Sequence, residues 1–161
     1  MSLAIVEECS KFLIREGLTI AFAESATAGR ICAEFALAAD AGKCLKGGIV
    51  CYDACIKQDL LNVPDELIKQ YTPESEEVTE AAAQGLQKLI PADIHLAVTG
   101  LTAPGGSESP EKPVGTIFIH GIKDKKMFSE RCLFSGDKES ILVKTVERVA
   151  ELVLNRVFFL Y

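Results

Sequence analysis

The sequence has no run of apolar residues that approaches the length of about 20 needed to cross a bilayer. Its N-terminus also lacks the charged and then apolar pattern of a secretory signal. Basic residues are in the minority, because 17 Lys and Arg stand against 23 Asp and Glu, and the formal net charge is −6. Such a balance excludes the basic surface typical of nucleic-acid binding. We therefore expect a cytoplasmic protein that binds neither membranes nor nucleic acid.

Patterns that bind metals are also lacking. The six cysteines include no C-x-x-C pair, and no histidine lies near Cys51 and Cys55. The two histidines, His95 and His120, stand within apolar segments that resemble strands, so they fit a core or sheet edge better than a catalytic site. We therefore expect no metal, no cofactor, and reduced thiols that are mostly buried.

The spacing of apolar residues predicts an α/β fold. Helices are predicted over 2–16, 28–39, 57–61 and 138–158, and two further helices are predicted to begin near Pro64 and Ser75. Strands are predicted over 18–23, 47–52, 94–99, 114–120 and 127–134. This order predicts a three-layer α/β/α sandwich with a mixed, mostly parallel sheet of about five strands, because the last two strands resemble a hairpin. At this length we expect a single domain over 1–161.

The residues after the first predicted strand carry the clearest functional signal. The stretch Ala23-Glu24-Ser25-Ala26-Thr27-Ala28-Gly29-Arg30 places a hydroxyl between a strand and a helix. The first N–H groups of a helix have no partners inside it, so they would face whatever Ser25 attacks and stabilise an oxyanion there. The alternative is that Ser25 or Thr27 only caps the following helix.

Two further strand ends bring polar groups to the same edge, where open α/β sheets bind ligands. Tyr52 follows the second strand, and Thr99 and Gly100 end the third. Lys57 comes five residues after Tyr52 and can point back toward this edge. Because a serine nucleophile needs a base and no histidine is well placed, Lys57 is the candidate, provided that its pKa falls from about 10.4 to about 7–8. The alternative is a solvated surface lysine.

Two loops have backbone N–H groups suited to an anion. Pro104-Gly105-Gly106 can form a nest, and Ser135-Gly136-Asp137-Lys138 leads into the last helix with a lysine at its start. The alternative is that both are ordinary turns.

Taken together, these segments resemble the C-terminal domain family of the CinA competence-damage proteins, whose stand-alone members include nicotinamide mononucleotide deamidases. The motif Ala-Glu-Ser-Cys-Thr-Gly-Gly is similar to Ala23–Gly29, Gly-Gly-x-Val-x-Tyr-x4-Lys to Gly47–Lys57, Leu-x-Val-Pro-x-Glu-x-Leu/Ile to Leu61–Ile68, Val-Ser-Glu-Glu-Val to Glu74–Val78, and Val-Thr-Gly-Ile-Ala-Gly-Pro to Val98–Pro104. Pro-Glu-Lys-Pro-Val-Gly-Thr matches Pro110–Thr116 at every position. The resemblance covers essentially the whole chain.

The resemblance implies an amidohydrolase that converts nicotinamide mononucleotide and water to nicotinic acid mononucleotide and ammonia without a metal. Ser25 would be the nucleophile, Lys57 its base, and Tyr52 a hydroxyl that orients or shuttles a proton between them. The residues expected to bind the substrate are Glu24, Thr27, Gly29, Gly48, Thr99, Gly100, Pro104, Gly105, Gly106 and Lys138. The pyrophosphatase chemistry of the domain that precedes this one in full-length members is not expected.

The sequence departs from these motifs at several positions. Ala26 replaces a cysteine, Ala28 and Ala103 replace glycines, and Lys138 and Leu142 stand where the family has arginines. Lysine meets a phosphate only as a point charge, and leucine cannot meet it at all. The alternative function is therefore a catalytically silent or substrate-shifted relative that binds a nucleotide or a protein partner.

The resemblance also implies a homodimer or a larger homo-oligomer. The segment Val157–Tyr161 is more apolar than a free terminus should be. We expect it either to take part in this assembly or to pack on the sheet of its own chain.

Overall fold

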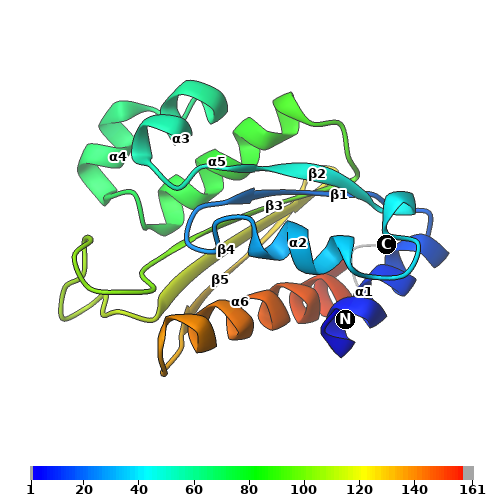
Figure 1. Cartoon of the computed structure of the whole chain (residues 1–161). Coiled ribbons are helices and arrows are strands. Elements are labelled where there is room, and N and C mark those ends of the chain that lie inside the picture. Colours follow the sequence, from blue (N-terminus) through cyan, green and yellow to red (C-terminus); the bar gives the residue numbers. More distant parts are fainter. Residues whose placement is uncertain (1, 158–161) are drawn as a thin grey trace.

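In the computed structural model, which describes residues 2–157, helices cover both faces of one five-stranded sheet (Figure 1). The strands are β1 (Ile20–Glu24), β2 (Leu45–Val50), β3 (Ile94–Gly100), β4 (Thr116–Lys123) and β5 (Lys126–Leu133). The helices are α1 (Ala4–Arg15), α2 (Arg30–Ala36), α3 (Ala54–Leu61), α4 (Asp65–Tyr71), α5 (Glu76–Leu89) and α6 (Lys138–Leu152), with a 3₁₀ turn η1 (Ala41–Lys43) and a π-helical turn η2 (Val153–Val157). The predicted α/β/α sandwich is confirmed.

The strand order is β2-β1-β3-β4-β5. β1 pairs in parallel with both β2 and β3, whereas β3–β4 and β4–β5 are antiparallel, so that only β4 runs against the other strands of the described sheet. The sheet is therefore mixed and mostly parallel, as predicted. Because β1, β2 and β3 run in one direction, their carboxyl ends meet at one edge, and Ser25, Tyr52 and Gly100 lie there.

Alternating side-chain size along β1 gives the two faces of the sheet different layers. Ile20 and Phe22 belong to a large apolar core with α1, α2 and α6. Ala21 and Ala23 belong to a second core on the other face, beneath α3, α4 and α5. The small side chains of this second face allow α5 to pack directly on the central strands.

A glycine in α5 fixes the neighbouring helix α3. A Cβ atom at Gly85 would lie 2.0 Å from the carbonyl oxygen of Leu61, so the two helix backbones are in direct contact. No other residue fits at this crossing without moving α3. The contact therefore sets the position of the helix that carries Lys57.

Most element boundaries differ from the prediction by a few residues, and three of the differences have a clear local cause. α2 begins at Arg30 rather than at 28, because Ala28 and Gly29 have φ angles of 49° and 95° and cannot continue a right-handed helix. Pro64 is the N-cap of α4 rather than its first helical residue. The last helix changes from α to π winding at Val153. Apolar spacing does not encode these local backbone changes.

His95 and His120 lie within β3 and β4 and are 5% and 4% exposed, which confirms their assignment to the core. All six cysteines are free, with Cys9, Cys44, Cys51 and Cys132 buried, Cys32 half-buried and Cys55 exposed. The prediction that the thiols are mostly buried is confirmed.

Over residues 2–157, no group of three or more His, Cys, Asp or Glu side chains could hold a metal ion. The same part of the chain contains no helix with the length and apolar character of a membrane span. Of the apolar segment Val157–Tyr161, Val157 is buried in the large core, and 158–161 lie outside the described residues.

Candidate active site

Ser25 and Lys57 form a direct hydrogen bond at the carboxyl edge of the sheet. Lys57 Nζ lies 2.9 Å from Ser25 Oγ and 3.0 Å from the carbonyl oxygen of Cys51. Both residues are buried, since Ser25 is 5% and Lys57 is 1% exposed. Ser25 follows β1 and Lys57 belongs to α3, so the fold brings together two side chains far apart in the sequence. The alternative of a solvated surface lysine is wrong.

The burial of Lys57 favours its neutral amine. Loss of contact with water lowers the pKa of Lys57 below its ordinary value, although the negative charges of Glu74 and Asp53 act against this shift. A neutral amine can accept the hydroxyl hydrogen bond of Ser25 while one of its own N–H groups donates to Cys51. This is the arrangement that a general base needs beside a nucleophile.

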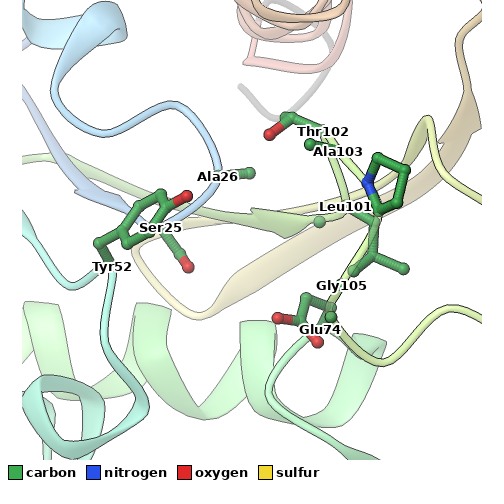
Figure 2. A pocket seen from close by; sticks show the side chains of 11 residues that line it. Ser25, Ala26, Tyr52, Glu74, Leu101, Thr102, Ala103 and Gly105 are labelled. Atoms are coloured by element: carbon green, nitrogen blue, oxygen red, sulfur yellow. The ribbon is translucent and has the colours of Figure 1, made fainter. Parts of the chain in front are cut away.

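Ser25 opens onto a cavity of about 250 Å³ (Figure 2). Ser25, Ala26 and Tyr52 form one side of it, and Glu74 and the segment 100–106 form the other. Ligand cavities commonly measure about 300–1,000 Å³, so this one suits the reacting end of a substrate better than an entire nucleotide. Tyr52 is 59% exposed, and its hydroxyl has no hydrogen-bond partner within residues 2–157.

The expectation that the start of α2 faces the substrate is wrong. The carboxylate of Glu24, which is 1% exposed, accepts the N–H groups of Ile31 at 2.7 Å and Cys32 at 3.0 Å. The first free amides of α2 are therefore bound by a carboxylate of the chain itself. In contrast, the N–H of Ala26 has no acceptor among the described residues, and Ala26 lines the cavity. An amide directly after a nucleophile is a common oxyanion donor.

The capping alternative for Ser25 and Thr27 is also wrong. The N-cap of α2 is Gly29, and neither hydroxyl accepts an N–H group of this helix. Ser25 contacts Lys57, and the hydroxyl of Thr27 donates to Glu24 at 2.7 Å. Glu24 thus performs the capping from the end of β1, and the hydroxyl of Ser25 is left for another role.

Glu24→Gln is expected to destabilise the fold, because a neutral amide cannot accept all three of the hydrogen bonds that the buried carboxylate accepts. We expect a loss of about 2 kcal/mol in the free energy of unfolding, measured in urea with an unchanged m-value. Glu77→Gln, an equal change of charge at an exposed position of α5, is the control and should stay within about 0.5 kcal/mol of wild type. An unchanged stability with a raised KM would instead make Glu24 a substrate-binding residue.

The predicted nest at Pro104-Gly105-Gly106 forms, but it holds an anion of the chain itself. The N–H groups of Gly105 and Gly106 each donate to a carboxylate oxygen of Glu108 at 2.8 Å. These backbone hydrogen bonds lower the pKa of Glu108 and keep it charged. The nest amides are therefore engaged within the loop, although both glycines line the cavity.

The other predicted substrate residues divide into two groups. Those that line the cavity are Gly100, Pro104, Gly105 and Gly106. Thr99, Gly48 and Gly29 are not in the lining; Thr99 is buried, whereas Gly29 is half-buried and Gly48 is exposed on β2. Thr99 Oγ1 is 2.8 Å from Thr79 Oγ1, and a Cβ at Gly48 would meet Cys32 Sγ at 2.6 Å. Gly29 has left-handed geometry close to Val50. None of these three positions contacts the cavity, and their role in substrate binding stays a prediction.

Lys138 is the exposed first residue of α6 and is not among the residues that line the cavity. The N-cap residue of α6 is Asp137, whose side chain accepts the N–H of Ser140 at 2.8 Å. Nothing in the cavity wall therefore depends on Lys138, and its contact with a phosphate stays a prediction.

Sequence reasoning missed Glu74, Leu101 and Thr102, which also line the cavity. A signal for Glu74 was present. A helix that leads into a parallel strand must begin at the carboxyl edge of the sheet, and Glu74 stands just before α5, which leads into β3. Residues near the start of α5 were therefore candidates for the same edge as Ser25.

Comparison with known proteins agrees with this architecture. The sequence model of the CinA C-terminal domain matches residues 3–157. A competence-damage inducible protein of Desulforudis audaxviator is 34% identical over 147 residues, which cover 89% of this chain and 35% of that protein. A CinA-like protein of Dictyoglomus turgidum is 34% identical over 142 residues, covering 88% of this chain and 34% of the relative. The chain thus spans about a third of the length of these curated relatives.

Solved structures give the same result. The competence damage-inducible protein A (ComA) of Klebsiella pneumoniae superposes with a TM-score of 0.90 at 27% identity, over 95% of this chain and 94% of its own. The competence/damage inducible protein CihA of Agrobacterium tumefaciens has a TM-score of 0.88 at 26% identity, over 96% of both chains. The chain belongs to the CinA C-terminal domain family.

Proposed function

We propose that the protein is a metal-independent amidohydrolase that acts on a pyridine mononucleotide, with nicotinamide mononucleotide as the substrate that the motif resemblance implies. The observation that carries the proposal is the buried contact of 2.9 Å between Lys57 Nζ and Ser25 Oγ beside an open cavity. A buried lysine with a lowered pKa next to a serine hydroxyl is costly to maintain for structure alone.

In the proposed reaction, Ser25 Oγ attacks the carboxamide carbon while its proton passes to Lys57 Nζ. The N–H of Ala26 stabilises the negative charge on the carbonyl oxygen. Lys57 then returns the proton to the departing nitrogen, which leaves as ammonia, and the acyl group remains as an ester on Ser25. A water molecule then attacks the ester carbon while its proton passes to Lys57 Nζ, and Lys57 returns this proton to Ser25 Oγ as the bond to the acyl group breaks and the carboxylic acid is released. Tyr52 lines the same cavity, and the motif resemblance supports a role for its hydroxyl in orienting these proton transfers.

The test is ammonia release by the purified protein. We expect ammonia from nicotinamide mononucleotide in amounts equal to the nicotinic acid mononucleotide formed. The acid product itself, which has no carboxamide, is the matched negative substrate. An absence of ammonia above the level of a Ser25→Ala preparation, with the wild-type protein folded by circular dichroism, would contradict the proposal. Calorimetric binding of the mononucleotide without turnover would then favour the silent relative.

A further inference from the structure

Glu74 is the only charged side chain among the residues that line the cavity within 2–157. It lies across the cavity from Ser25 and Tyr52, below Gly105 (Figure 2). No lysine or arginine of the described residues joins it in the lining. The wall opposite the nucleophile is therefore negatively charged.

The carboxylate of Glu74 is held in place with one oxygen left free. Ser107 Oγ donates to Glu74 Oε2 at 2.5 Å, and Lys112 Nζ donates to the main-chain oxygen of Glu74 at 2.7 Å. Lys112 also contacts the hydroxyl of Thr72 at 2.5 Å. Glu74 Oε1 has no hydrogen-bond partner among residues 2–157, although Glu74 lines the cavity. This oxygen is a free carboxylate acceptor on that wall.

The groups near the cavity that could neutralise Glu74 or attract an anion are largely engaged. Lys57 is shifted toward its neutral form by burial. Lys112 is a cation whose charge interacts with Glu74, but its Nζ donates to Thr72 and to the main-chain oxygen of Glu74 rather than to the carboxylate, and Lys112 is outside the lining. The nest amides bind Glu108, and the first amides of α2 bind Glu24. The charges that remain therefore suit a cation near Glu74 better than an anion.

We propose that Glu74 makes the cavity selective for carboxamides whose ring carries a permanent positive charge. A pyridine ring with a substituent on its nitrogen is such a cation, whereas an unsubstituted pyridine or benzene carboxamide is neutral. The attraction between this ring and the carboxylate opposite Ser25 would hold the carboxamide against the nucleophile. The inference rests on the proposed function only in its choice of carboxamides as ligands. The preference for a charged ring over a neutral one can be measured by binding, without turnover.

The experiment compares two ligands of similar size in a Ser25→Ala background, which prevents turnover. 1-Methylnicotinamide is a cation and nicotinamide is neutral, and both carry the same carboxamide. We expect the cation to bind about tenfold more tightly by calorimetry at low salt, a difference of about 1.4 kcal/mol. Adding Glu74→Gln, which keeps the size and a hydrogen-bond acceptor, should reduce this preference to less than twofold and leave the affinity for nicotinamide unchanged.

Glu77→Gln removes an equal charge from an exposed position of α5 and is the matched control, with the tenfold preference retained. If Glu74→Gln does not fold, the wild-type preference should still fall several-fold between about 0.05 and 0.5 M salt. An equal preference in the Glu74 variant and its control, a preference insensitive to salt, or no binding of either ligand would each overturn the inference. A preference that depends on Glu74 in a protein without ammonia release would support it and reject the proposed function alone.

Discussion

Ser25→Ala is expected to abolish ammonia release, with kcat lowered by about 10⁴-fold or more, because it removes the only atom proposed to form a bond with the substrate. The change deletes one oxygen whose side-chain hydrogen bond among residues 2–157 is with Lys57 Nζ. The fold should therefore persist, and the free energy of unfolding and the circular dichroism spectrum should stay close to those of wild type. Mononucleotide binding should also persist, since the walls of the cavity remain.

Ser10→Ala is the matched control, because Ser10 is also buried but belongs to α1 and lies outside the cavity lining. We expect its activity to stay within about twofold of wild type. Near-normal turnover in Ser25→Ala would show that another group attacks the substrate. Mass spectrometry of the wild-type protein during turnover gives a second readout, since the ester on Ser25 adds the mass of the acyl group.

Lys57→Met is expected to lower kcat by about 10²–10⁴-fold, because it keeps the aliphatic stem and deletes the base. In the wild-type enzyme, burial lowers the pKa of Lys57, so the rate should rise with pH as the amine loses its proton and then level off below the ordinary value of 10.5. The residual rate of Lys57→Met should lack this rise. Lys88→Met, at an exposed position near the end of α5, is the control and should keep both rate and pH profile.

The same lysine predicts a dependence of stability on pH. Its pKa is lower in the folded protein than in the unfolded chain, so between these two values the unfolded chain binds more protons. The free energy of unfolding of the wild type should therefore rise with pH across that interval. At pH values below the interval, Lys57 should contribute no dependence on pH. Relative to Lys57→Met, the wild type should gain stability as the pH rises toward 10.5. A difference that does not change with pH would mean that Lys57 is not neutralised by burial.

The sequence predicted both the layers of the fold and the contact between Ser25 and Lys57, and it did so for the same reason. Apolar spacing identifies strands and helices, and the parallel arrangement of β1, β2 and β3 follows from the helices between them. Once these strands share an edge, the residues that follow them must converge. The contact between Ser25 and Lys57 is a consequence of this topology more than of any local pattern.

The engagement of the expected anion sites could not be predicted in the same way. The amides of α2 are available to Glu24 only because Ala28 and Gly29 adopt left-handed geometry, which apolar spacing does not encode. Gly105 and Gly106 likewise form the expected nest, but the composition of a loop does not reveal which carboxylate fills it. Sequence identifies groups capable of binding an anion, whereas the folded backbone decides whether a neighbour has already bound to them.

The close approach of α3 and α5 at Gly85 has a consequence for redesign. It fixes the position of α3, and with it Lys57 next to Ser25, because the backbone of α3 lies directly against that of α5. The opposite wall over 100–106 belongs to the connection between β3 and β4, and side-chain hydrogen bonds from Ser107 and Lys112 fasten this connection. If the proposed function holds, exchanging residues of that connection is expected to change which amides enter the cavity while the contact between Ser25 and Lys57 is kept.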